Sequence, residues 1–115
     1  MTTNKTNNKK TGNYGESLAV EYLVSRGYKI LERNLNLNVG EIDILAREKN
    51  ITVIVEVKTV RGTNYGPAKG YVNLKKQHKL KLLALELGQK YKLNHIRIDV
   101  IGIDLSDPET PIIEH

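Results

Sequence analysis

The segment over residues 40–58 constrains the fold most, because it joins two strand-like runs through a very short polar break. Its sequence, GEIDILAREKNITVIVEVK, alternates Ile and Val with polar residues on both sides of Lys49-Asn50. This alternation is typical of two antiparallel strands joined by a tight turn. If Lys49-Asn50 is the whole turn, Glu48 faces Ile51. The register is a specific prediction, since a shift by one residue would move every side chain to the opposite face.

The predicted register brings four charged side chains to one face of the hairpin. Asp43 falls opposite Glu56, and Glu41 falls opposite Lys58. Side chains alternate along a strand, so these four project from the same side. The other side is a continuous apolar surface made of Ile42, Ile44, Val53, Val55 and Val57. Because like charges opposite one another destabilise a sheet, Asp43 and Glu56 need a compensating cation.

Three acids facing one lysine indicate a divalent cation. Mg²⁺ prefers one or two carboxylates, retained waters and substrate phosphate oxygens. The candidate ligands are Asp43, Glu56 and the backbone carbonyl of Val57, with Glu41 or Glu16 in reserve. Lys58 would orient or deprotonate an attacking water, or stabilise the charge that develops on the phosphoryl group. Metal-assisted phosphodiester hydrolysis is the reaction class that uses these groups.

A simpler alternative stays open at this point. Exposed charged faces are common on antiparallel strands, and Glu41 with Lys58 would then be an ordinary cross-strand ion pair.

The rest of the chain predicts one α/β domain. A helix over residues 14–28 ends at Gly27 and carries Glu16 at the start of an apolar stripe. The three strand segments cover residues 28–35, 40–48 and 51–58, a second helix covers 71–91, and a last strand covers 95–105. The apolar face of the second helix consists of Leu80, Leu83, Ala84 and Leu87. The domain is expected over residues 13–105, between a disordered polar arm (1–12) and a tail (106–115).

The charge balance favours a polyanionic partner. Lys and Arg number 18 against 13 acids, for a net charge of +5. Nucleic acid is the first candidate and an anionic membrane surface the second. The chain has no cysteine, no apolar leader and no apolar run that could span a bilayer, which predicts a cytoplasmic protein without disulfides.

The second helix begins with a basic edge. Lys75, Lys76 and Lys79 form a ridge suited to phosphate contacts, and Arg61 precedes it in the chain. The alternative for such a ridge is a solvated helical face. Tyr14, Tyr65 and Tyr71 lie near predicted loops, where they would stack on bases or anchor the loops.

Taken together, the motifs resemble a known family over residues 12–103. They are Gly15-Glu16, Ala19, Tyr22-Leu23, Gly27-Tyr28, Asn34, Gly40-Glu41-Ile42-Asp43, Val55-Glu56-Val57-Lys58, Tyr65-Gly66-Pro67, Lys76-Gln77 and Arg97-Ile98-Asp99-Val100. Their order and spacing resemble the YraN family of small bacterial proteins. Asp43 followed by Glu56-Val57-Lys58 resembles the signature of the PD-(D/E)XK nuclease superfamily.

The resemblance implies a restriction-endonuclease-like fold, a central mixed β-sheet flanked by helices in the order α-β-β-β-α-β, as in Holliday junction resolvases. It implies that Asp43 and Glu56 bind Mg²⁺ or Mn²⁺ and that Lys58 is the catalytic lysine. Glu16 matches an acid that many resolvase-like proteins bring to the site from a helix. Gln77 matches a polar residue that some members place near the site from the helix that follows the motif strands. Glu41 and Asp99 match family positions without an assigned role. One departure is Val60, where family members often carry arginine, so that the basic residue here is Arg61.

The expected function is therefore a metal-dependent nuclease acting on DNA, including branched or structured DNA, rather than on RNA. Two alternatives are a nucleic-acid-binding module without turnover and an interaction subunit of a DNA-processing complex. As in the resolvases, a homodimer is one state to test.

Overall fold

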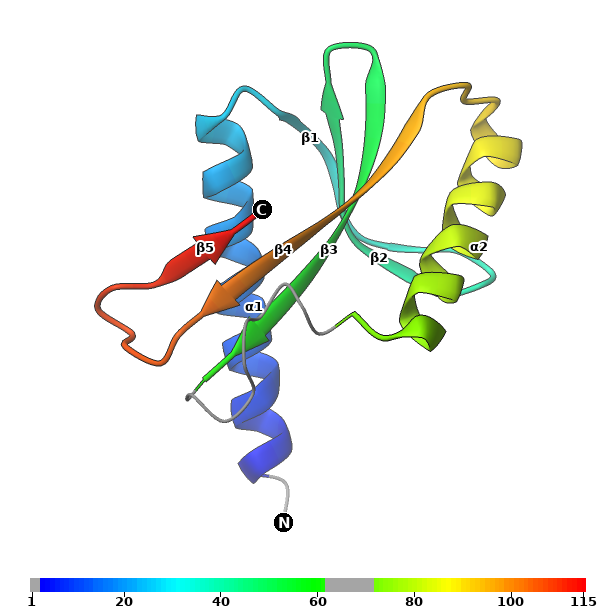
Figure 1. The fold of residues 1–115 in the computed structure, drawn as a ribbon. Coiled ribbons are helices and arrows are strands. Elements are labelled where there is room, and N and C mark those ends of the chain that lie inside the picture. Colours follow the sequence, from blue (N-terminus) through cyan, green and yellow to red (C-terminus); the bar gives the residue numbers. More distant parts are fainter. Residues whose placement is uncertain (1–2, 62–71) are drawn as a thin grey trace.

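The structure, a computed structural model, describes residues 3–61 and 72–115, with side chains described from residue 12 onward. These residues form a mixed five-stranded sheet that lies between two helices (Figure 1). The strands are β1 (Lys29–Asn36), β2 (Glu41–Glu48), β3 (Ile51–Val60), β4 (Ile96–Asp104) and β5 (Ile112–Glu114). The helices are α1 (Thr3–Ser25) and α2 (Leu74–Tyr91).

The strands follow one another across the sheet in sequence order. β1, β2 and β3 form an antiparallel meander, β3 pairs in parallel with β4, and β5 returns antiparallel to β4. The parallel pair needs a crossover, and α2 provides it. The predicted mixed sheet and the order α-β-β-β-α-β are confirmed. The short strand β5, which lies within the segment predicted as a tail, was missed.

The hairpin register is the one that the sequence predicts. Glu48 pairs with Ile51, and the ladder continues without a shift to Ile44 opposite Val55. Lys49 has a φ of 55°, the left-handed conformation that a two-residue hairpin turn requires.

Each face of the sheet has its own core. Ala19 and Leu23 of α1 pack against Ile44, Val53 and Val55 on one face. On the other face, the leucines of α2 pack against Ile54, Leu45 and Ile42; these leucines are Leu80, Leu83 and Leu87. Grouping Ile42 on one face with Ile44, Val53 and Val55 was therefore wrong. Ile42 precedes Ile44 on β2, in the part of this strand that is not paired with β3.

Helix α1 is longer than predicted. It begins at Thr3 rather than near Tyr14, and so includes residues that the sequence placed in the polar arm. No proline interrupts this stretch, and extending an existing helix costs far less than starting one. The helix ends as predicted, with Gly27 at a φ of 90°. The division of the chain into an arm, a domain and a tail stays a prediction.

A matched pair of leucines in α2 tests this packing. Leu83 is 1% exposed, whereas Leu85 of the same helix is 60% exposed. We expect Leu83→Ala to lower the free energy of unfolding by about 2–5 kcal/mol, because it leaves a cavity in the core. Leu85→Ala should change it by less than about 0.5 kcal/mol. Urea unfolding measures both, and equal effects would contradict the orientation of α2.

Candidate metal centre at the opening of the β2–β3 hairpin

The candidate site lies where β2 and β3 separate. The ladder between them ends at the pair Ile44 and Val55, and beyond it the strands diverge (Figure 1). Asp43 is the next residue on β2, and its Oδ2 accepts a hydrogen bond from the backbone N–H of Val57 at 2.9 Å. The N–H and C=O of a strand residue point to the same side, so the Val57 carbonyl also faces the opening.

Asp43 and Glu56 interact in this opening, although the ladder ends one pair before the directly opposed positions 43 and 56 that the sequence predicted. The pKa of Asp43 is raised to about 7 from its ordinary 3.8, first by burial and then by the adjacent Glu56 carboxylate, against the opposing effects of the Val57 N–H and of Lys76. Asp43 therefore keeps a proton up to near neutral pH, unless a cation takes its place.

The cation beside the pair comes from α2. Lys76 Nζ lies 2.9 Å from Oε2 of Glu56, and the Glu56 side chain is only 13% exposed. The first turn of α2 fixes the backbone of this lysine, because the side chain of the N-cap Asn73 accepts a hydrogen bond from the Lys76 N–H at 2.8 Å. The sequence assigned Lys76 to a nucleic-acid-binding ridge, whereas the structure places it at the acids.

Glu16 approaches the same opening from α1, on the other side of the sheet. Burial raises its pKa, and the Asp43 and Glu41 carboxylates raise it as well, against the effect of Arg33. A Cβ atom at Gly15 would overlap the Thr59 side chain, so glycine allows α1 to lie close to β3 here. Oε1 of Glu16 is buried and has no hydrogen-bond partner.

These groups fit a hard divalent cation in their chemistry. Asp43, Glu56 and the Val57 carbonyl offer oxygen atoms, which Mg²⁺ and Mn²⁺ prefer. The orphaned oxygen of Glu16 indicates that this part of the opening lacks a positive partner. In the part of the chain that the structure describes, no three acidic or histidine side chains are close enough to hold a metal by themselves. Waters or substrate oxygens would therefore complete the coordination, as is usual for Mg²⁺.

Lys58 lies on the same face of β3 as Glu56, two residues further along the strand, and is exposed. β3 remains paired with β4 beyond this point, so its alternation is regular. Neither Lys58 nor Glu41 has an ion pair within residues 3–61 and 72–115. The plain cross-strand pair that the sequence left as an alternative does not form.

The other predicted residues are divided between the opening and the surface around it. The Gln77 side-chain amide donates a hydrogen bond to the carbonyl of Val72, at 2.8 Å. The Lys79 side chain lies so close to Gly40 that a Cβ atom at position 40 would displace the lysine. Lys75 and Arg61 are exposed. Tyr65 and Tyr71 lie outside the described residues, and Tyr14 is exposed on α1.

The turn between β1 and β2 is fixed to α2. The Glu86 carboxylate accepts hydrogen bonds from the backbone N–H groups of Asn38 at 2.8 Å and Val39 at 2.9 Å. This contact sets the start of β2, and with it Asp43, relative to the helix that carries Lys76.

A second polar cluster, at the hairpin end of the sheet, was missed. Arg97 bridges Glu48, Asp99 and the Tyr28 hydroxyl at 2.8–3.0 Å. His115 Nε2 lies 2.6 Å from Asp99 Oδ2. Burial alone would raise the pKa of Asp99, but the bonds from Arg97 and His115 hold it below its usual value.

His115 takes part in this cluster although it belongs to none of the sequence motifs. Its other ring nitrogen is 3.2 Å from the Tyr22 hydroxyl, which is far away in the chain. No spacing motif signals such a contact. The cluster ties β5 to α1 and β4.

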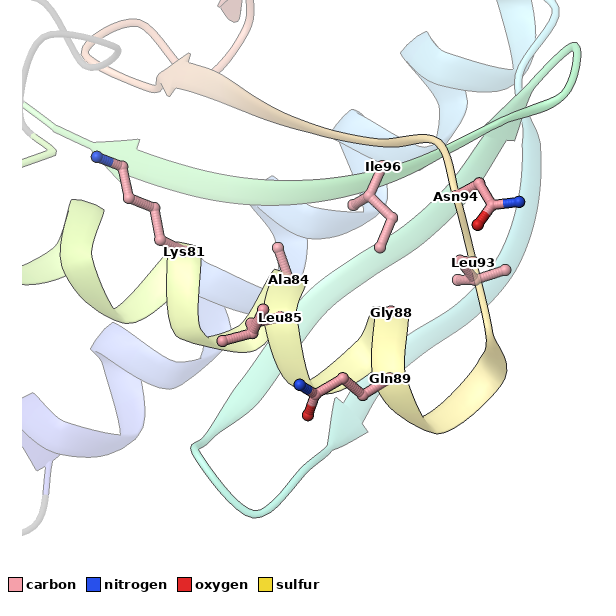
Figure 2. A pocket seen from close by; sticks show the side chains of 8 residues that line it. All are labelled: Lys81, Ala84, Leu85, Gly88, Gln89, Leu93, Asn94 and Ile96. Atoms are coloured by element: carbon pink, nitrogen blue, oxygen red, sulfur yellow. The ribbon is translucent and has the colours of Figure 1, made fainter.

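A hollow between α2 and the start of β4 contains no acid. Leu85, Gly88 and Ile96 line it, together with Lys81 and Asn94 (Figure 2). It therefore does not share the chemistry of the opening between β2 and β3. Among the described residues, the helices are all too short or too polar to cross a membrane.

The pKa of Asp43 predicts how stability depends on pH. Because the folded-state pKa is raised from 3.8 to about 7, the folded protein binds more protons than the unfolded chain within this window. Stability should therefore fall as the pH rises from about 4 to about 7, and stay level above that.

Asp43→Asn keeps an acceptor for the Val57 N–H but removes the titration. We expect the stability of this variant to fall much less between about pH 4 and pH 7. At about pH 8 it should be more stable than the wild type, by an amount on the order of 1–2 kcal/mol. Urea unfolding without added metal, at several pH values, measures this. Parallel pH profiles for the two proteins would contradict the raised pKa.

Comparisons with known proteins agree with the motif order. The chain matches the model of the uncharacterised protein family UPF0102 over residues 15–103. It is 44% identical to a UPF0102 protein of Dehalococcoides mccartyi over 106 residues, which cover 90% of this chain and 87% of that protein. It is 46% identical to one of Geobacter metallireducens over 110 residues, or 94% and 89% of the two chains. The chain belongs to the UPF0102 family, as the resemblance to YraN proteins predicted.

Proposed function

We propose that this protein is a metal-dependent nuclease of the PD-(D/E)XK type, which hydrolyses phosphodiester bonds of DNA and accepts branched or otherwise structured DNA. The observation that carries the proposal is Asp43, which accepts a hydrogen bond from the Val57 N–H beside Glu56 and has a pKa raised to about 7. Perturbed acids of this kind concentrate at functional sites. A cytoplasmic location belongs to the same proposal.

The chain's own groups would take distinct roles. Asp43 and Glu56, with the Val57 carbonyl, would hold Mg²⁺ or Mn²⁺, and Glu16 would contribute through a bound water. When bound, such an ion polarises the phosphoryl group and lowers the pKa of a coordinated water. Lys58, exposed and on the Glu56 face, would orient the attacking water or stabilise charge at the phosphorus.

Basic residues around the opening would contact the DNA backbone. Lys79 lies against Gly40 at the start of β2, and Lys75 is exposed in the same first turns of α2. Arg61 follows the end of β3. Contacts of this type position a duplex without reading its sequence, which agrees with a preference for DNA shape.

A second candidate function is a nucleic-acid-binding module without turnover. The ion pair between Lys76 and Glu56 favours it, because one acid of the pair is already neutralised by the protein itself. Such a module would bind DNA with a strong dependence on salt and would leave it intact.

Cleavage assays on a four-way junction and a matched duplex, with Mg²⁺ or Mn²⁺, test the proposal. We expect the wild type to cut in the presence of metal and to stop when a chelator is added. Glu56→Gln and Lys58→Met should each lower the rate by roughly 100-fold or more, because each removes a group that acts on the transition state. The matched controls are Glu109→Gln and Lys90→Met, which change exposed residues outside the site.

If the wild type binds DNA in a salt-dependent way but does not cleave it, the nuclease function is overturned and the binding module remains. An absence of both would point to an interaction subunit. Equal loss of activity in the Glu109 or Lys90 variants would show that the effects do not come from the site.

A further inference from the structure

One feature of the opening distinguishes it from a bare carboxylate site, namely that it already contains a cation. The Lys76 ammonium is 2.9 Å from Glu56 Oε2, and its side chain is 38% exposed while that of Glu56 is 13% exposed. The lysine end of this ion pair is therefore partly solvated, whereas the glutamate end is mostly buried. One ammonium faces two adjacent carboxyl groups, and it also lowers the pKa of Asp43.

The acids are fixed and the lysine is not. Asp43 is bonded to the Val57 N–H, and Glu56 stands on β3, which is paired with β4 along its whole length. By contrast, only the backbone of Lys76 is held, by the Asn73 cap. Four flexible carbons separate that backbone from the ammonium. The charge can therefore leave the acids without any movement of α2.

An ammonium and a divalent cation exclude one another at this place. Lys76 has no lone pair with which to join a coordination shell. Two positive charges within a few ångströms repel strongly where water is scarce. A metal that uses Glu56 must therefore replace the ammonium on that carboxylate.

We propose that Lys76 is a resident counter-ion, which holds Glu56 in the metal-free protein and leaves it when a divalent cation binds. This inference rests on the proposed metal site. The released ammonium would lie on α2 beside Lys79, which is three residues further along the helix and whose side-chain end lies against Gly40, just before β2. Metal loading would then supply the nucleic-acid surface with an additional cation.

Mg²⁺ titration followed by NMR tests the inference on the full chain at about pH 8. Lys76→Met keeps the length of the side chain and removes its charge, and Lys75→Met is the matched control on the neighbouring exposed residue. We expect the Mg²⁺ dissociation constant, measured from the side-chain carboxyl shifts of Asp43 and Glu56, to fall roughly three- to tenfold in Lys76→Met. In Lys75→Met it should stay within about twofold of the wild type.

A second readout follows the wild-type lysine directly. The Lys76 Nζ and Cε signals should move to the values of a solvated lysine as Mg²⁺ saturates the acids. One outcome would overturn the counter-ion role of Lys76 and leave the metal site standing. In it, Mg²⁺ shifts the carboxyl signals of Asp43 and Glu56, but the Lys76 signals do not move and Lys76→Met binds Mg²⁺ as the wild type does. If neither protein responds to millimolar Mg²⁺, the metal site and the counter-ion both fail.

Discussion

The candidate site and the separation of β2 from β3 both depend on the hydrogen bond between the Asp43 carboxylate and the Val57 N–H. At this point a side chain takes over from the backbone ladder, which ends at Ile44 and Val55. The substitution lets β2 and β3 separate without leaving the Val57 N–H unpaired, which would be costly in a partly buried place. The site and the divergence of the strands therefore have one cause. A carboxylate used in this way is buried beside Glu56, and burial first and this neighbour second raise its pKa.

The opening brings together groups from both layers of the fold. Glu16 reaches it from α1 and Lys76 from α2; the Asp43 carboxylate raises the pKa of Glu16, and Lys76 lowers that of Asp43. Close contacts maintain this arrangement: Gly15 lets α1 approach β3, and Glu86 binds the β1–β2 turn to α2. A site on strands that are supported in this way is more precise than one on loops. The excess of acids over cations is the reason to expect a metal there.

Local information was sufficient to predict β1 to β4 and the register of the β2–β3 hairpin, but not β5. A two-residue turn and strict alternation place Asp43 near Glu56 without knowledge of the rest of the fold. The partner of Glu56 could not be predicted, because it depends on where α2 docks after a long connection. The side on which Ile42 packs follows from the divergence, which alternation does not encode. The contact of His115 with Asp99 and Tyr22 joins three distant segments and leaves no pattern in the sequence.

Paramagnetic broadening by Mn²⁺ tests the central claim, that the opening between β2 and β3 is a metal centre, most directly. Substoichiometric Mn²⁺ is added to the ¹⁵N-labelled protein at about pH 8, above the pKa of about 7 of Asp43. The account predicts that the amide signals of Asp43, Glu56 and Val57 disappear first, followed by that of Glu16, and that Asp43→Asn abolishes this order. Broadening that begins instead at the exposed acids Asp107 and Glu109, or none at all, would contradict the account.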